Sequence, residues 1–102
     1  MGWLQNIFGK KVDFKALKES GAILLDVRNP GEVKSAGISC AVNIPLQKLT
    51  DKEVEKIRKK NKPVVCVCAS GVRSNMAKNK LKAAGVEVYN GGSWRKMKAY
   101  FG

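Results

Sequence analysis

Histidine is absent from this chain of 102 residues. Its absence excludes Ser-His-Asp and Cys-His catalysis and every metal site that uses an imidazole ligand. A nucleophile in this protein must therefore be activated by another group. Long apolar runs are missing too, and none approaches the roughly 20 residues that cross a bilayer. At this length we expect one domain with one modest core.

Cysteine is scarce, and the three cysteines are Cys40, Cys66 and Cys68. An odd count in a short chain does not suit a disulfide framework, and three thiols without histidine make a poor zinc site. We therefore expect reduced thiols in a cytoplasmic protein, with no metal and no cofactor. Cys66 lies between valines and is predicted to be inert core. Cys40, in or beside a predicted strand, is also predicted to be structural.

Acidic residues are few: 8 Asp and Glu stand against 20 Lys and Arg, which gives a net charge of +12. The basic residues are spread over several predicted helices, as expected of a solvated surface. Such a charge can also steer small anions or meet an acidic partner. No base-stacking surface of interleaved aromatic residues is visible, so we do not expect nucleic acid as a partner.

Residues 1–11 are predicted to form a separate amphipathic segment. Its apolar side chains would share one face of a short helix, and they are Trp3, Leu4, Ile7 and Phe8. This start lacks the basic and long apolar regions of a secretory signal. We expect the apolar face to cap the core. The alternative is a weak contact with a membrane surface, to which Lys10 and Lys11 would contribute. Two helical turns are too short to favour this alternative.

Strand and helix patterns alternate along the rest of the chain. Apolar runs predict strands at residues 22–27, 39–44, 63–68 and 86–89. Helices are predicted between Asp13 and Gly21 and at residues 46–61, 75–84 and 93–101, with turns at 28–32 and 90–92. In the helix at 75–84 we expect Met76, Ala77, Leu81 and Ala84 to face inward. The alternation predicts an α/β domain with a mainly parallel sheet of four or five strands and helices on both faces.

Two segments with reactive side chains follow predicted strands, which is where ligands bind in open parallel sheets. Asp26 and Arg28 come at the end of the first strand. Cys68 ends the third strand, and a short loop follows it: Ala69, Ser70, Gly71, Val72, Arg73 and Ser74. These two segments are the candidate site.

The loop after Cys68 has the composition to activate a thiol. Its backbone amides can form an anion-binding nest, and the next helix adds the positive end of its dipole. Arg73 adds a full charge, and each of these groups lowers the pKa of the thiol. Gly71 permits a positive φ or a close approach to an anion. Alone, Cys68 would be an ordinary small buried residue, but this spacing predicts a nucleophile.

Four motifs, in order, resemble those of the rhodanese-like sulfurtransferase family. Residues 24–32 (LLDVRNPGE) are similar to D-V-R-x-P-x-E, and residues 36–45 (AGISCAVNIP) to G-H-I-x-G-A-x-N-I-P. Residues 68–74 (CASGVRS) are similar to the active loop C-x-x-G-x-R-S, and residues 90–94 (NGGSW) to the closing G-G-x-x-W with one residue fewer. Gly37 stands where the family usually has His, and Cys40 where it usually has Gly.

The resemblance implies a rhodanese-like domain at residues 12–102 and a two-step sulfur transfer. The Cys68 thiolate would take the outer sulfur of a small anionic donor, such as thiosulfate or polysulfide. A thiol, sulfite or cyanide acceptor would then remove that sulfur from the persulfide, and a sulfur-relay protein could be a partner. The loop amides would hold the sulfur, and Arg73 would steer and stabilise the donor.

The other motif residues are given supporting roles by the resemblance. Arg28 would add a positive field at the rim of the site. Asp26 would pair with a nearby arginine or with loop amides. Ser74 would cap the helix after the loop, and Trp94 would lie in the core.

The length of the loop distinguishes sulfur transfer from the other functions of similar loops. Related phosphatases and arsenate reductases use C-x5-R, whereas Cys68 and Arg73 are spaced as C-x4-R, the form associated with sulfur. A phosphatase is therefore disfavoured. Two alternatives remain open. The first is a non-catalytic interaction or regulatory module, or a persulfide carrier for a partner protein. The second is a thiol sensor.

Overall fold

The computed structural model describes residues 12–102, so the predictions for residues 1–11 lie outside the described residues. The elements in chain order are α2 (Phe14–Glu19), β1 (Ile23–Asp26), α3 (Pro30–Ser35), β2 (Val42–Asn43), the 3-10 helix η1 (Leu46–Lys48), α4 (Asp51–Lys59), β3 (Val64–Cys68), α5 (Val72–Ala83), β4 (Val88–Ser93) and α6 (Trp94–Phe101). Within this part of the chain, no helix is long and apolar enough to cross a membrane.

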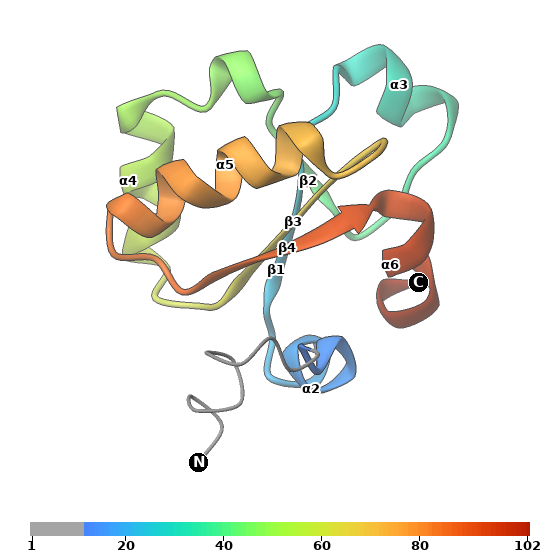
Figure 1. Ribbon diagram of the computed structural model, residues 1–102, viewed down its shortest axis with the longest axis horizontal. Coiled ribbons are helices and arrows are strands. Elements are labelled where there is room, and N and C mark those ends of the chain that lie inside the picture. Colours follow the sequence, from blue (N-terminus) through green and yellow to red (C-terminus); the bar gives the residue numbers. More distant parts are fainter. Residues whose placement is uncertain (1–11) are drawn as a thin grey trace.

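The four strands form one parallel sheet in the order β2-β1-β3-β4. The predicted α/β class is confirmed, with four strands in the described residues. β3 lies inside the sheet, and all five of its residues are buried, which fits its continuous apolar sequence. Figure 1 shows α5 lying across the strands, with α6 following directly from the end of β4.

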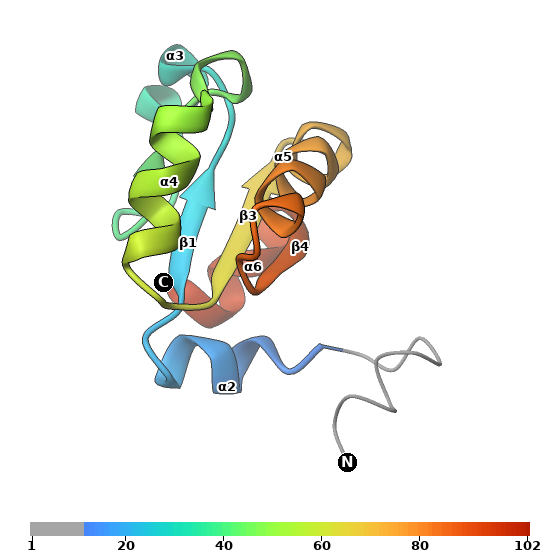
Figure 2. The same cartoon turned by 90° about the vertical axis from the view of Figure 1, so that its left-hand side faces the viewer.

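Helices cover both faces of the sheet, as the sequence predicts. Successive side chains of a strand point to opposite faces, so neighbours on β1 enter different cores. Leu25 packs in the core under α4 and α5, whereas Leu24 packs in the core formed with α6. α2 lies against α6, where Phe14 and Tyr100 stack with ring centroids 5.9 Å apart. Figure 2 shows α4 and α5 flanking the strands, and α2 lying across one end of them.

Three predicted elements between β1 and β3 are wrong in their bounds. The predicted turn at 28–32 contains α3, because Asn29 and Glu32 form a capping box and Pro30 occupies the first turn. The predicted helix at 46–61 is divided into η1 and α4, and Thr50 caps α4 by accepting the Glu53 N–H at 3.4 Å. The predicted strand at 39–44 pairs only over β2.

α5 begins three residues earlier than the sequence predicts. Gly71 is its N-cap with a φ of +104°, so Arg73 and Ser74 lie in the first turn of the helix and not in a loop. The predicted inward face is only partly right. The buried residues of α5 are Ser74, Ala77 and Leu81, whereas Met76 and Ala84 are exposed.

β4 continues through the segment that the sequence predicts to be a turn at 90–92. Its register against β3 shifts there, because Cys66 pairs with Asn90 and Val67 pairs with Gly92. Gly91 is therefore the extra residue of a β-bulge. A Cβ at Gly91 would lie 2.7 Å from Met97 Cγ, so glycine is what allows α6 to pack this closely.

Candidate active site

Cys68 lies at the carboxyl end of β3, where the chain turns into α5. The residue is 1% exposed, and its Sγ accepts a hydrogen bond from the Gly71 N–H at 3.0 Å. The positive φ of Gly71 aims this amide back at the sulfur. Ala69 and Ser70 are exposed in the loop, and Val72 is 67% exposed at the start of α5. The Cys68 side chain is therefore buried, while the loop residues that follow it face solvent.

The surroundings of Cys68 favour its thiolate. Burial alone would raise the pKa of the thiol, but the net shift is downward. The Ser74 hydroxyl lowers the pKa most, followed by the backbone amides of Ser74, Gly71 and Ser70. These amides belong to the turn and the first residues of α5, where backbone donors have no partner within the helix. Such a site can hold a negative charge on or next to Sγ.

The other two cysteines have different environments. Cys66 is fully buried, and burial is the main reason why the pKa of its thiol rises to about 12, with the neighbouring Cys68 adding to it. This matches the predicted inert core thiol. Cys40 is exposed and donates a hydrogen bond to the Phe101 carbonyl at 3.4 Å. All three thiols are free, and no cluster of three or more potential metal ligands occurs in residues 12–102.

Arg73 is paired with Glu32, a residue that the sequence reasoning did not assign to the site. The guanidinium donates from NH1 to Glu32 Oε2 at 2.7 Å and from NH2 to Oε1 at 3.0 Å. Hydrogen bonding to Arg73 is the main cause that lowers the pKa of Glu32 to about 2, and the Asn29 amide adds to it. The pair joins the first turn of α5 to α3. Glu32 is the acidic residue of the first motif, and its place in that motif is the sequence feature that could have assigned it to the site.

Asp26 and Arg28 form a buried ion pair at the end of β1. Arg28 NH2 lies 2.8 Å from Asp26 Oδ2, and the two residues are 3% and 0% exposed. Arg28 is thus buried and paired, and its charge also helps to lower the pKa of Glu32, while its field at the rim of the site stays a prediction. Its guanidinium also donates to the Ala36 carbonyl at 2.9 Å and stacks on Trp94, 4.7 Å from the ring centroid. Trp94 is 6% exposed, as a core residue should be.

Gly37 packs closely against the same ion pair. A Cβ at Gly37 would lie 3.1 Å from Arg28 NH2 and 3.3 Å from the Val33 carbonyl oxygen. A side chain there would need these neighbours to give way by a few tenths of an ångström. The usual family motifs carry both the arginine and the histidine, so the ion pair alone does not account for the glycine.

Ser74 does not cap α5, contrary to prediction, because Gly71 is the N-cap residue. Ser74 is fully buried, its Oγ lies 3.5 Å from Cys68 Sγ, and its hydroxyl donates to Asn90 Oδ1 at 2.6 Å. Asn90 also donates from Nδ2 to the Gly71 carbonyl at 3.1 Å. No sequence pattern indicates this role for Asn90, because the sequence predicts a turn where the structure has a β-bulge.

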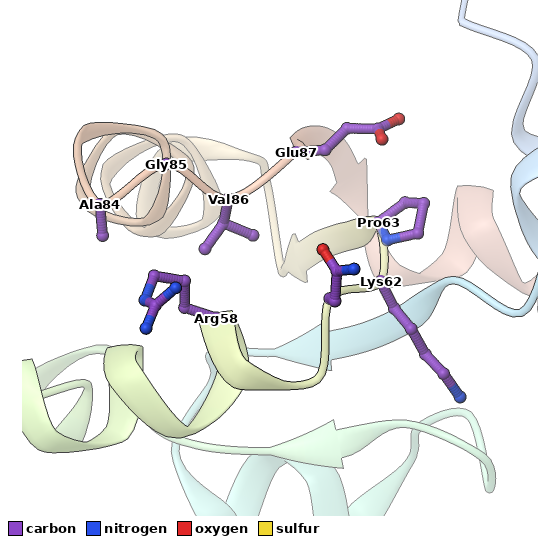
Figure 3. A pocket seen from close by; sticks show the side chains of 8 residues that line it. Arg58, Lys62, Pro63, Ala84, Gly85, Val86 and Glu87 are labelled. Atoms are coloured by element: carbon purple, nitrogen blue, oxygen red, sulfur yellow. The ribbon is translucent and has the colours of Figure 1, made fainter.

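A cavity of about 310 Å³ lies at the opposite end of the strands, where β3 begins and α4 and α5 end. Figure 3 shows Arg58 of α4 opposite Val86 across this cavity. Helix carboxyl ends carry a partial negative charge, and Arg58 is already paired with Glu55 at 2.6 Å. None of the residues that line this cavity belongs to the Cys68 loop, so the cavity is separate from the candidate site.

Comparison with known proteins relates the chain to one family. The family model for the rhodanese-like domain matches residues 11–99. The uncharacterized protein YqhL of Bacillus subtilis is 43% identical over 70 residues, covering 68% of this chain and 54% of YqhL. A putative mitochondrial thiosulfate sulfurtransferase of Schizosaccharomyces pombe is 34% identical over 89 residues, covering 74% of this chain and 63% of the relative. The chain thus spans about half to two thirds of the length of these relatives.

One solved structure extends the likeness to a protein of similar size. The human single-domain sulfurtransferase TSTD1 superposes with a TM-score of 0.61 at 27% identity, and the match covers 80% of this chain and 86% of that one. The parallel sheet and its helices therefore have the same fold as that protein.

Proposed function

The chain belongs to the rhodanese-like domain family, and from this premise we propose that it is a sulfurtransferase with Cys68 as its nucleophile. The donor is a small anion that carries a sulfane sulfur, such as thiosulfate or polysulfide. The acceptor is a thiol, sulfite or cyanide. The sulfur rests on Cys68 between the two, and the reaction takes place in the cytoplasm, where thiols stay reduced.

The proposed reaction has two displacement steps. The Cys68 thiolate attacks the outer sulfur of thiosulfate, a bond forms between the two sulfur atoms, and sulfite leaves with the electron pair of the broken bond. The acceptor then attacks the outer sulfur of the persulfide. The bond between the two sulfur atoms breaks, and Cys68 leaves as a thiolate again. No external oxidant or reductant is consumed.

The observation that carries this proposal is the hydrogen bond from the Gly71 N–H to Cys68 Sγ at 3.0 Å. A backbone donor fixed on a buried sulfur stabilises negative charge there without histidine. The Ser74 and Ser70 amides act in the same direction. The net charge of +12 favours the approach of an anionic donor. Arg73 holds the start of α5 through Glu32, and its side chain stays 32% exposed beside the loop, where a donor would approach.

Intact-mass measurement after incubation with thiosulfate or polysulfide tests the proposal. We expect the protein to gain the mass of one sulfur atom and to lose it again when cyanide or sulfite is added. The adduct should disappear in Cys68→Ser and remain in Cys40→Ser, whose exposed thiol is the matched control. Failure of every donor to produce an adduct would overturn the sulfurtransferase.

A second candidate function is a non-catalytic interaction module or a persulfide carrier for a partner protein. It is favoured by two apolar side chains one turn apart on α5, because Val72 is 67% exposed and Met76 is 56% exposed beside the loop. A non-catalytic module keeps its function in Cys68→Ser and loses it in Met76→Glu. The sulfurtransferase gives the opposite pattern with small donors and acceptors.

A further inference from the structure

The side chains of Cys68, Ser74 and Asn90 and the backbone of Gly71 form a closed ring of hydrogen bonds. The Gly71 N–H donates to Cys68 Sγ at 3.0 Å, and Sγ lies 3.5 Å from Ser74 Oγ. The Ser74 hydroxyl donates to Asn90 Oδ1 at 2.6 Å, and Asn90 Nδ2 donates to the Gly71 carbonyl at 3.1 Å, which closes the ring. The ring joins the nucleophile, the first turn of α5 and the bulge of β4.

The orientation of the Asn90 amide is fixed by two backbone groups. Its Nδ2 faces the Gly71 carbonyl, which can only accept, and its Oδ1 faces the Gly92 N–H at 2.9 Å, which can only donate. Turning the amide over would lose both bonds. Oδ1 has no hydrogen, so Ser74 must be the donor of the 2.6 Å bond.

This leaves the Ser74 hydroxyl with a single hydrogen and two acceptors that need it. While that hydrogen points to Asn90, only a lone pair of Ser74 faces Cys68, and this suits a thiol that donates its own hydrogen. A thiolate has no hydrogen to donate. To bind a thiolate, the hydroxyl must turn to Sγ and give up Asn90.

We propose that Asn90 is a positioning residue that competes with Cys68 for the hydrogen of the Ser74 hydroxyl, so that the thiol and the thiolate are bound by two arrangements of one ring. Asn90 thereby draws the Ser74 hydrogen away from Sγ and limits how strongly this hydroxyl stabilises the thiolate. The inference concerns the Cys68 of the proposed sulfurtransferase, but it is tested by ionisation of the thiol and not by sulfur transfer.

Other charged and titratable groups near Cys68 remain in place when Asn90 is changed. They are Arg73 on α5, its partner Glu32 on α3, Asp26 and Arg28 at the end of β1, and Cys66 on β3. None of them makes a hydrogen bond to Asn90 or to the Ser74 hydroxyl in the described part of the chain. Their electrostatic contribution is therefore common to all the variants compared below.

The test is the pH dependence of Cys68 alkylation by iodoacetamide, measured in a Cys40→Ser background so that the exposed thiol does not react. Asn90→Ala frees the Ser74 hydroxyl, and we expect the midpoint of the alkylation profile to fall by about half a pH unit or more. Ser74→Ala removes the donor and raises the midpoint. With Ser74→Ala already present, Asn90→Ala should cause no further fall.

The double variant separates competition for a hydrogen from loosening of the loop. If Asn90 only holds the loop, Asn90→Ala moves the midpoint equally with and without Ser74, and that result overturns the proposal. An unchanged or raised midpoint in Asn90→Ala alone overturns it as well. Asn90→Leu, which fills more of the space, repeats the test if the alanine variant does not fold. Asn79→Ala, the same change on the exposed face of α5, should leave the midpoint unchanged.

Discussion

The middle of β3 and its carboxyl end hold two cysteines whose pKa values are shifted in opposite directions. Cys66 and Cys68 are two residues apart, belong to one core under α4 and α5, and are 0% and 1% exposed. Yet the pKa of Cys66 is raised to about 12, mainly by burial, whereas that of Cys68 is lowered although burial opposes the shift. Burial alone therefore does not determine which thiol is reactive.

The difference lies in what the nearby backbone amides are bound to. Within β3, the amides beside Cys66 are used by the ladders to β1 and β4. After Cys68 the chain leaves the sheet, and the amides of Ser70, Gly71 and Ser74 turn to the sulfur. A strand end next to a helix start thus turns a core cysteine into a candidate nucleophile.

Gly71→Ala is the most direct way to break this contrast. The residue has a φ of +104°, and a Cβ would lie 3.3 Å from Gly92 Cα, so alanine must shift the turn and its amide. We expect the rate of Cys68 persulfide formation to fall about a hundredfold, because the donor to Sγ is misplaced. Stopped-flow kinetics with thiosulfate would measure the change.

Gly85→Ala is the control for backbone strain. Its φ is +89°, and nothing lies within 4 Å of the added Cβ. Both substitutions should lower the free energy of unfolding, each by about 1–2 kcal/mol, but only Gly71→Ala should slow persulfide formation. Equal rates in the two variants would contradict the role of the Gly71 amide.

Glu32→Gln should have a smaller effect on the same contrast. It removes the charge that binds Arg73 through two hydrogen bonds and holds the start of α5 on α3. We expect persulfide formation to slow about tenfold as the turn loosens. The pKa of Glu32 is about 2, below its ordinary value of 4.5, so the pair is complete above pH 4.5 and is lost as the pH falls towards 2.

Glu55→Gln provides the matched change at the other edge of the sheet. Glu55 also binds an arginine through two hydrogen bonds, to Arg58 at 2.7 and 2.6 Å, but it lies on α4 far from the Cys68 turn. Its substitution should leave the rate unchanged. If both variants slow the reaction equally, the loss of a negative charge anywhere on the protein explains the effect, and the ion pair between Glu32 and Arg73 does not.

An effect on stability and not on rate is expected from Cys66, whose contribution to folding depends on pH. As the pH rises above 9.0, the unfolded chain ionises this thiol while the folded chain keeps it protonated up to about 12. The folded state therefore loses up to about 1.4 kcal/mol per pH unit from Cys66 in that range. Cys68 acts with the opposite sign below 9.0, since its lowered pKa adds stability as the pH rises.

Urea unfolding at about pH 8.5 and about pH 10.5 would measure the difference. Cys66→Ala should lose less stability than the wild type between the two values, because titration of the lysines and tyrosines is common to both proteins. Parallel stability curves for the two proteins would show that Cys66 is not the source of the decline.

Much of the fold could be predicted because the buried strands are continuous apolar runs. β1 and β3 have that pattern, and the alternation with helices predicts the parallel sheet correctly. Short elements were harder, because local composition was outweighed by capping and packing. Asn29-Pro30-Gly31 suggests a turn but starts α3, and Asn90-Gly91-Gly92 suggests a turn but forms a bulge in β4 under Met97.

The candidate site was predictable in its nucleophile and less so in its supports. The spacing of Cys68, Gly71 and Arg73 marks the loop, but no local pattern says that Arg73 binds Glu32, 41 residues away. Likewise, the resemblance allows Asp26 to pair with a nearby arginine, but only the packed structure shows that this arginine is Arg28 and that it also stacks on Trp94. Such pairs depend on where α3 and α6 come to lie after folding.

The close approach of Arg28 to Gly37 constrains how this sequence can evolve. An added side chain at position 37 would need the guanidinium to give way by a few tenths of an ångström, although Asp26 Oδ2 and the Ala36 carbonyl hold it at 2.8 and 2.9 Å. The same movement would shift the cation on the face of Trp94. We therefore expect the cost of a substitution at position 37 to depend on which residues stand at positions 28 and 94.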